Sequence, residues 1–215
     1  MKISRGFKIS LFVIFLLIID QIIKILVKTN MTIGQSIHVF GSWFQILFIE
    51  NNGMAFGMQF GGNVGKFILS IFRVVLVIAI IIYIRKLLKR EDTPTGVLLG
   101  LAAILCGALG NIIDSLFYGM IFSESTFTQV AELFPAGGGY SGFLFGKVVD
   151  MFYFPIIDTT LPENFPIWGG RHFIFFRPIF NFADACITCG AIYLLIFKWK
   201  FFSKASKAEE SDPAK

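Results

Sequence analysis

The stretch Phe180-Asn181-Phe182-Ala183-Asp184 opens the last long apolar run of the chain, residues 185–197, and puts an ionisable side chain at its entrance. An aspartate at the mouth of a membrane helix is costly unless it is paired, hydrated or used in chemistry. The stretch also resembles a helix start. With Asn181 as the N-cap, Asp184 falls in the first turn, where free N–H groups and the helix dipole favour its ionised form. The stretch therefore suits either a functional site or a plain helix cap.

The composition is typical of a membrane protein. Of the 215 residues, 55% are hydrophobic and 15% are charged, and the mean hydropathy is +0.74. A soluble domain averages about 25% charged residues. The net charge of +5 comes from basic residues that cluster beside apolar runs, a pattern that sets membrane topology and does not indicate a nucleic-acid-binding surface. We therefore expect no nucleic-acid partner.

Four apolar segments approach the length of about 20 residues that a membrane-spanning helix needs. They cover residues 8–27, 66–84, 97–118 and 182–199. The first has the basic start of a cleavable signal peptide, but it lacks a small-x-small cleavage site and its apolar run resumes beyond Asp20, so we expect it to be retained. The third is rich in Gly and Ala, which allows neighbouring helices to approach closely.

The remaining segments are not expected to span the membrane. Residues 30–62 contain two β-prone runs, Ser36–Phe40 and Trp43–Ile49, and their aromatic side chains suit a small sheet at the membrane surface. Residues 119–178 are rich in Gly and Pro and are expected to form an extended outer loop. The sequence thus predicts a mainly α membrane protein with four transmembrane helices, organised as one domain over residues 1–202. Residues 203–215 form a polar tail that we expect to be disordered.

Basic residues predict the orientation of the chain. They are dense at the N-terminus, in residues 85–90 and in the tail, so all three segments are expected in the cytoplasm and both long loops outside. The acidic and amide residues near the outer ends of the helices then gather at one face. They are Asp20, Asp114, Asp150 and Asp184, with Asn51, Asn111 and Asn181. Helix capping alone does not explain so many polar residues converging from three helices and two loops.

The spacing of these residues suggests how they interact. Asp20 and Lys24 are four residues apart and share one helix face, so they can form an ion pair; Asn111 and Asp114 share another. Two carboxylates that face one water can cleave an amide bond, because one removes the proton of the water while the other, protonated, polarises the carbonyl. An aspartyl hydrolase is therefore plausible, and the residues alone leave open which two acids form the pair.

Metal and thiol chemistry are not indicated. His38 is one of only two histidines; His172 is far away in the sequence, and His38 has no Cys or acidic neighbour at ligand spacing. The three cysteines, Cys106, Cys186 and Cys189, lie in apolar helices, where thiols behave as small hydrophobic groups.

Taken in order, the polar motifs resemble those of the bacterial lipoprotein signal peptidase (signal peptidase II) family. They are Asp20-x-x-x-Lys24, Asn51-x-Gly53-x-Ala-Phe, Gly-Asn111-x-x-Asp114, Val-Val-Asp150 and Phe-Asn181-x-Ala-Asp184. Each motif is weak alone, but the ordered set covers most of the chain and is specific. The resemblance implies an aspartyl protease of the bacterial inner membrane. Such a protease removes the signal peptide of prolipoproteins just before a cysteine that carries a diacylglyceryl group.

The resemblance also implies roles for individual residues. Asp150 and Asp184 would be the catalytic dyad. The supporting residues would be Asp20, Lys24, Asn51, Gly53, Asn111, Asp114 and Asn181. The first outer segment would match a β-cradle at the membrane surface, and part of the second a lid helix. We expect diacylglyceryl-modified prolipoproteins and membrane lipid as partners, no metal or organic cofactor, and a monomer with both termini in the cytoplasm.

The sequence departs from the family pattern in two places. Ser115 stands where the family usually has Arg, and residues 119–147 and 153–177 are longer than expected. We hypothesise that Arg73 or Arg171 supplies the missing positive charge.

Two other classes of function fit parts of the sequence. The acids can serve as the proton relay of a small ion-coupled transporter, or the small-residue face of the third helix can serve a non-catalytic assembly factor. Acids that gather at one face, and the absence of a repeated half, favour the peptidase over the transporter.

Overall fold

The computed structural model describes residues 4–52 and 62–203. Gly53 and the rest of the motif after Asn51 lie outside the described residues, as does the tail from residue 204. The chain divides into two compact units, which we describe separately. The helical unit comprises Met1–Asp20, Ile71–Gly110 and Ala183–Lys215, and the sheet unit comprises Gln21–Ser70 and Asn111–Phe182.

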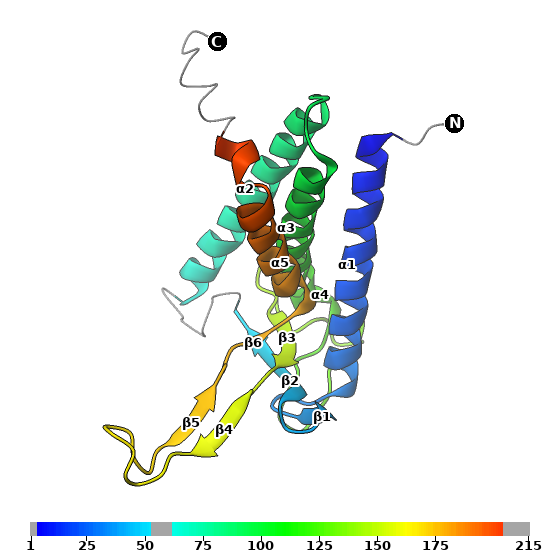
Figure 1. The fold of residues 1–215 in the computed structure, drawn as a ribbon. Coiled ribbons are helices and arrows are strands. Elements are labelled where there is room, and N and C mark those ends of the chain that lie inside the picture. Colours follow the sequence, from blue (N-terminus) through cyan, green and yellow to red (C-terminus); the bar gives the residue numbers. More distant parts are fainter. Residues whose placement is uncertain (1–3, 53–61, 204–215) are drawn as a thin grey trace. The chain divides into compact units, whose positions relative to one another are not determined.

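Long helices carry the apolar runs (Figure 1). They are α1 (Arg5–Asn30), α2 (Gly62–Leu88), α3 (Thr95–Ile113) and α5 (Phe182–Phe197). A π-helical turn, η2 (Asp114–Tyr118), and the short α4 (Gly119–Ile121) continue α3. Three helical stretches, Arg5–Asn30, Val64–Leu88 and Thr95–Ile121, are long and apolar enough to cross a membrane, whereas α5 has 16 residues. The mainly helical membrane class is confirmed, and a fourth span remains a prediction.

Within the helical unit, small residues bring α3 and α5 together. A side chain at Gly107 would place its Cβ 2.2 Å from the carbonyl oxygen of Ala183, and one at Gly190 would lie 2.7 Å from the carbonyl oxygen of Gly100. Any larger residue at these positions would force the two backbones apart. The prediction that the third apolar helix permits close helix packing is therefore confirmed.

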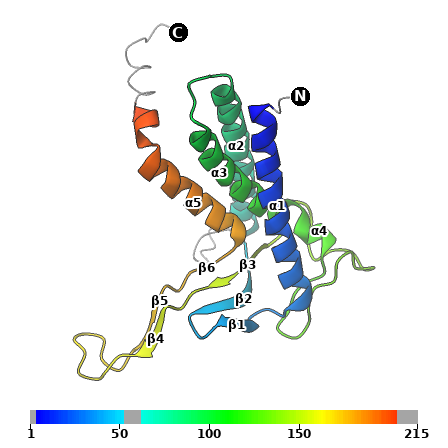
Figure 2. The same cartoon turned by 45° about the vertical axis from the view of Figure 1, so that its right-hand side comes forward.

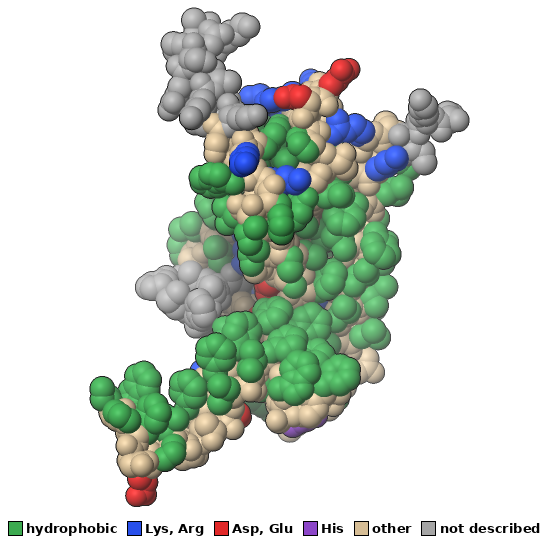
Figure 3. Space-filling view, viewed as in Figure 1, with side chains coloured by type: hydrophobic (Ala, Val, Ile, Leu, Met, Phe, Trp, Pro, Cys, Tyr) green, Lys and Arg blue, Asp and Glu red, His purple; other side chains and the backbone are tan. Residues whose placement is uncertain are grey.

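The outer surface of the helical unit is apolar along the helices and basic at one end (Figure 3). Large side chains are exposed, among them Phe15 and Phe72, which are 62% and 61% accessible. This exposure suits helices that face lipid rather than water. At the basic end, Arg5 donates a hydrogen bond of 2.5 Å to the carbonyl oxygen of Thr93, so the start of α1 is tied to the link between α2 and α3.

The sheet unit contains a four-stranded antiparallel sheet with the order β1-β2-β3-β6 (Figure 2). Its strands are β1 (Ser36–Phe40), β2 (Phe44–Asn51), β3 (Val148–Tyr153) and β6 (Ile179–Phe180). The first two strands agree with the β-prone runs of the sequence. β3 lies in residues 119–178, which were expected to form an extended loop, and that expectation is wrong for it. β6 begins just after that segment.

A second, two-stranded sheet also forms in this segment. β4 (Ile157–Thr160) pairs with β5 (His172–Phe175), from Ile157 opposite Phe175 to Thr160 opposite His172. Between residues 122 and 178 the structure has strands, turns and loops but no helix. The lid helix expected in the second outer segment is therefore not confirmed.

The apolar core of the sheet unit fixes the position of β3. Phe48 of β2 and Val149 and Met151 of β3 are fully buried in it. The other members of the core are Val27, Met31, Tyr118, Phe122 and Ala131. Because neighbouring residues of a strand point to opposite faces, burying Val149 and Met151 turns Asp150 to the other face of the sheet.

Candidate active site

Asp150 is held by amide groups from the strands on both sides of β3. Its carboxylate is buried, with 2% of the residue accessible. Nδ2 of Asn51 donates to Oδ2 at 2.6 Å, and Nδ2 of Asn181 donates to Oδ1 at 2.7 Å. The register that pairs Asn51 with Val148 brings the first amide into reach, and the pairing of β3 with β6 brings the second. Each oxygen of Asp150 therefore has a donor that fixes its direction.

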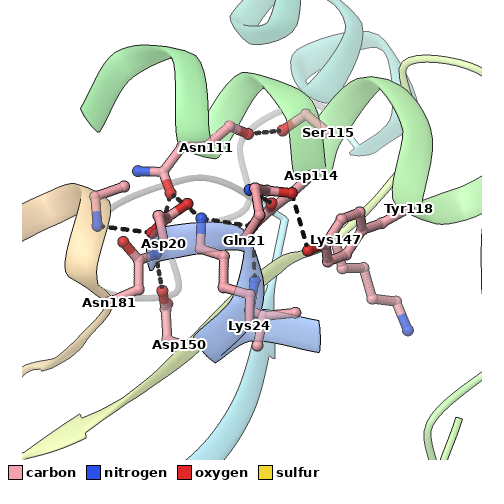
Figure 4. Close-up of polar contacts among 12 residues, drawn as sticks. Asp20, Gln21, Lys24, Asn111, Asp114, Ser115, Tyr118, Lys147, Asp150 and Asn181 are labelled. Carbon is pink, nitrogen blue, oxygen red and sulfur yellow. Dashed lines mark hydrogen bonds and ion pairs between the residues drawn. The ribbon is translucent and has the colours of Figure 1, made fainter. Parts of the chain in front are cut away.

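A buried lysine is linked to this carboxylate through two amides (Figure 4). Lys24 is fully buried, and its Nζ donates to Oδ1 of Asn111 at 3.0 Å. Nδ2 of Asn181 donates to the same oxygen at 3.1 Å, so Asn181 bridges Asn111 and Asp150. Lys24 also forms an ion pair of 2.8 Å with Asp114. One hydrogen-bonded network thus joins residues from α1, α3, η2, β3 and the segment before α5.

Asp114 connects this network to the backbone of β3. Its Oδ2 accepts a hydrogen bond of 3.3 Å from the N–H of Val149, the residue before Asp150. Its Oδ1 accepts one of 3.1 Å from Gln21, and Gln21 in turn accepts one of 3.1 Å from the hydroxyl of Tyr118. Sequence reasoning missed Gln21 and Tyr118. A glutamine between Asp20 and Lys24 in an apolar segment was a usable signal, because polar groups there need partners.

Ser115 has a local structural role at the position where an Arg was expected. It is buried in η2, and its hydroxyl donates to the carbonyl oxygen of Asn111 at 3.0 Å. The loop before β3 packs directly on this turn, since the N–H of Gly146 donates to the carbonyl oxygen of Ser115 at 2.9 Å. A Cβ at Gly146 would lie 2.0 Å from the carbonyl oxygen of Asp114, so only glycine fits there. π-helical turns are often found at functional sites.

Asp20 and Asp184 belong to the helical unit. Asp20 is fully buried, and its Oδ1 accepts a hydrogen bond of 2.9 Å from the N–H of Ala183, so it caps the first turn of α5. Asp184 lies in that first turn, as predicted, and Asn181 directly precedes the helix. The structure thus gives Asp20 a capping role that the sequence did not suggest. The Asp150–Asp184 dyad and the Asp20–Lys24 pair remain predictions.

A second buried lysine lies one turn further along α1. Lys28 is fully buried, forms an ion pair with Glu50 and donates to the hydroxyl of Ser125 at 2.9 Å. Lys147 lies 3.4 Å from the other oxygen of Glu50. The ring of Tyr140 packs against both lysines, and burial raises the pKa of its hydroxyl well above the usual value. Sequence reasoning missed this cluster, although the spacing of Lys24 and Lys28 placed both on one helix face.

The two arginines suggested as replacements for the family Arg lie in different places. Arg73 is in α2, within the helical unit, and Arg171 lies next to β5 in the sheet unit. Their role in substrate binding remains a prediction.

Comparison with known proteins identifies the family. A family model described as signal peptidase (SPase) II matches residues 12–200. The chain belongs to the signal peptidase II family. The lipoprotein signal peptidase of Porphyromonas gingivalis (strain ATCC 33277) is 49% identical over 195 residues, which cover 91% of this chain and 84% of that protein. The lipoprotein signal peptidase of Amoebophilus asiaticus is 38% identical over 184 residues, covering 84% and 73%.

Solved structures agree with the fold of this signal peptidase II family member. One bacterial membrane enzyme superposes with a TM-score of 0.56 at 25% identity, over 92% of this chain and 90% of that one. A second superposes with a TM-score of 0.57 at 24% identity, over 90% and 93%. The resemblance drawn from the ordered motifs is thus confirmed, and the chain is a protease by family.

Proposed function

We propose that this protein is an aspartic endopeptidase that removes the signal peptide from diacylglyceryl-modified prolipoproteins. The observation that carries the proposal is the amide-held carboxylate of Asp150 in a chain that belongs to the signal peptidase II family. Relatives at 49% and 38% identity are named lipoprotein signal peptidases, which supports the same class of substrate.

Asp150 and Asp184 are the proposed dyad. Two carboxylates that share one proton provide a base and an acid at the same site. The ionised carboxylate takes a proton from water as the water oxygen bonds to the scissile carbonyl carbon, and the protonated one hydrogen-bonds to the carbonyl oxygen. The C–N bond then breaks, and the amine of the lipid-bearing cysteine leaves with a proton from the dyad. The two carboxyls titrate as a coupled pair, so the shared proton belongs to the dyad rather than to either residue.

The other polar residues are proposed to position the dyad. Asn51 and Asn181 orient Asp150 directly, since each donates to one of its oxygens. Lys24, Asn111 and Asp114 hold Asn181 and β3 in place. Asp20 fixes the first turn of α5, which carries Asp184. We include Gly53 on the basis of the family motif alone.

The topology follows from the same proposal. Cleavage would occur at the outer face of the bacterial inner membrane, with both termini in the cytoplasm and the enzyme acting as a monomer. Four spans would then enclose the site, with α5 as the shortest at 16 residues.

The direct test uses purified protein and two matched prolipoprotein peptides, one with a diacylglyceryl-modified cysteine and one with a free thiol. We expect cleavage of the lipidated peptide only, on the amino-terminal side of the cysteine, as read by mass spectrometry. In ¹⁸O-labelled water, the released signal peptide should carry one ¹⁸O atom, because the oxygen of the hydrolytic water becomes part of its new carboxylate. Failure to cut the lipidated peptide would contradict the proposed substrate.

The dependence of rate on pH tests the two-carboxylate mechanism separately. An acid and a base that act together give a bell-shaped profile of kcat/KM. We expect this shape for the wild type, and a rate that stays flat across the acidic range would exclude the mechanism while leaving the substrate class intact.

A further inference from the structure

The β4–β5 hairpin forms an arm with an apolar surface that the proposed catalytic reaction does not use. We call residues 156–177 the aromatic arm. It extends away from the four-stranded sheet within the sheet unit (Figure 2), and hydrophobic side chains gather on the face seen in Figure 3, with acidic atoms at its far end. Ile167 at its tip is 91% accessible, and Trp168 is 51% accessible. Apolar exposure on this scale marks a surface that contacts another molecule or a membrane.

The arm also carries two cationic groups without counter-ions. Arg171 and Arg177 are both exposed. In the described part of the chain, neither guanidinium has a hydrogen bond or an ion pair. Their neighbour His172, by contrast, lies 2.6 Å from the carboxylate of Asp158. The arm has two acidic residues, Asp158 and Glu163. In the described part of the chain, no hydrogen bond or ion pair joins either of them to Arg171 or Arg177, so neither neutralises the arginines directly.

The two arginines line a groove of about 300 Å³ together with apolar residues. Leu161, Trp168, Phe173 and Ile174 form the rest of the lining, beside His172. The backbone holds the groove in shape, since the N–H of Leu161 donates to the carbonyl oxygen of Arg171 at 3.0 Å and the N–H of Gly170 donates to that of Leu161 at 3.1 Å. The groove thus combines two guanidinium groups with an indole and aliphatic walls.

This combination fits the chemistry of a phospholipid. Guanidinium groups bind phosphate oxygens with paired hydrogen bonds, and Trp side chains favour the boundary between headgroups and acyl chains. A diacylglyceryl group on a prolipoprotein has no phosphate, so it would leave both arginines without a partner. The phosphate of a membrane phospholipid would supply the negative charge that complements Arg171 and Arg177, and the lipid on the substrate would not.

We propose that the aromatic arm binds an anionic phospholipid of the surrounding membrane. The phosphate lies between Arg171 and Arg177, an acyl chain packs on the apolar wall of the groove, and the tip around Ile167 inserts at the membrane surface. This inference does not depend on the Asp150–Asp184 dyad and holds whether or not the peptidase proposal does.

The test follows Trp168 in the full-length protein. The chain has three tryptophans, so replacing Trp43 and Trp199 with Phe leaves Trp168 as the only indole. The protein is reconstituted in phosphatidylcholine bilayers, and phosphatidylglycerol with brominated acyl chains is titrated in as quencher. Brominated phosphatidylcholine is titrated in parallel as the zwitterionic probe. We expect Trp168 to be quenched at a much lower fraction of the anionic lipid.

Substitutions of Arg171 and Arg177 then test whether these two charges are responsible for the preference for anionic lipid. We expect Arg171→Gln/Arg177→Gln to raise the phosphatidylglycerol fraction for half-quenching about 30-fold, since each basic residue at an anionic surface contributes about fivefold. Arg171→Lys/Arg177→Lys, which keeps the charge, should recover most of that loss. Arg85→Gln/Arg90→Gln removes the same charge from the α2–α3 region and should shift the midpoint less than twofold.

Three results would overturn the inference. One is the absence of Trp168 quenching by either brominated lipid, which would place the arm away from the bilayer. Another is equal quenching by the two lipids with no effect of the arginine substitutions. The last is a shift that appears only when lipidated prolipoprotein peptide is added, which would make the substrate the occupant of the groove.

Discussion

Lys24 and Lys28 lie one turn apart on α1, and both are fully buried. They differ in the residues that they bind and in whether those residues contact Asp150. Lys24 pairs with Asp114 and reaches Asp150 through Asn111 and Asn181. Lys28 pairs with Glu50 and joins Ser125. The first network orients the candidate catalytic carboxylate, and the second holds the segment after α4 against strand β2.

A buried ion pair therefore does not by itself mark a catalytic group. Each lysine needs its carboxylate, because a buried charge without a partner destabilises the fold by about 3–5 kcal/mol. Replacing both members of a pair by apolar residues of similar volume is often neutral or stabilising. Substituting each lysine alone, and then together with its carboxylate partner, therefore distinguishes an effect on the free energy of unfolding from an effect on the rate of cleavage.

Among substitutions in the two lysine networks, the largest effect is expected for Lys24→Met. It leaves Asp114 buried without its cation, and we expect a loss of about 3–5 kcal/mol in the free energy of unfolding. We also expect cleavage per folded molecule to fall at least about 100-fold, because the positioning of Asp150 through Asn111 is lost. Thermal unfolding in detergent and cleavage of lipidated peptide measure the two quantities. In Lys24→Met/Asp114→Leu, stability should recover in part and cleavage should not, and wild-type cleavage by this variant would refute the assigned role of Lys24.

Lys28→Met should lower stability as much as Lys24→Met, about 3–5 kcal/mol, because the buried Glu50 loses its shorter ion pair and keeps the longer one with Lys147. Cleavage per folded molecule, however, should stay within about threefold of the wild type, since the bonds of Lys28 within the described residues run to Glu50 and Ser125 and not to Asp150. The matched variant Lys28→Met/Glu50→Leu should recover stability and keep activity. A loss of turnover in that double variant would show that the two networks are not separate.

Single hydrogen bonds refine the comparison. Asn181→Ala removes the donor to Oδ1 of Asp150, and we expect kcat to fall about tenfold to 100-fold with little change in substrate affinity, since a hydrogen bond to a charged group contributes about 1.5–3 kcal/mol. Ser125→Ala, its counterpart in the Lys28 cluster, should leave kcat unchanged and cost about 1–2 kcal/mol of stability. Steady-state kinetics at several substrate concentrations distinguish the two outcomes. Equal effects of Asn181→Ala and Ser125→Ala on kcat would contradict the proposed role of Asn181 in positioning Asp150.

The smallest effect is expected for Tyr140→Phe. The hydroxyl of Tyr140 accepts a hydrogen bond of 2.6 Å from the N–H of Lys147, so its removal should cost about 1 kcal/mol at neutral pH. Burial raises the pKa of Tyr140 above the unfolded value of 10.0. The neutral hydroxyl is thus favoured in the folded state, and its stabilising contribution is complete below pH 10 and lost as the pH rises beyond it. Thermal unfolding between pH 8 and 11 should show a shallower alkaline decline for Tyr140→Phe, and parallel curves would exclude this contribution.

The ordered motifs were sufficient to predict the family, because the polar residues keep their order and spacing inside apolar segments. The same residues did not reveal β3. Val148, Val149, Asp150 and Met151 are all buried, so the strand has no alternation of polar and apolar residues that the sequence can show. β6 is two residues long, and its pairing with β3 joins segments that are distant in the chain. The partners of Lys28 come from equally distant segments and were missed for the same reason.

The proposed dyad is tested by comparing cleavage of a diacylglyceryl-modified prolipoprotein peptide by Asp150→Asn, Asp184→Asn and the wild type. Each substitution keeps the size of the side chain and removes its titratable charge. We predict that both variants bind the peptide within a few-fold of the wild type and lose turnover by about 100-fold to 10,000-fold, the range of general acid–base catalysis. A variant at either position that binds and still cleaves within about tenfold of the wild-type rate would contradict the assignment of the dyad.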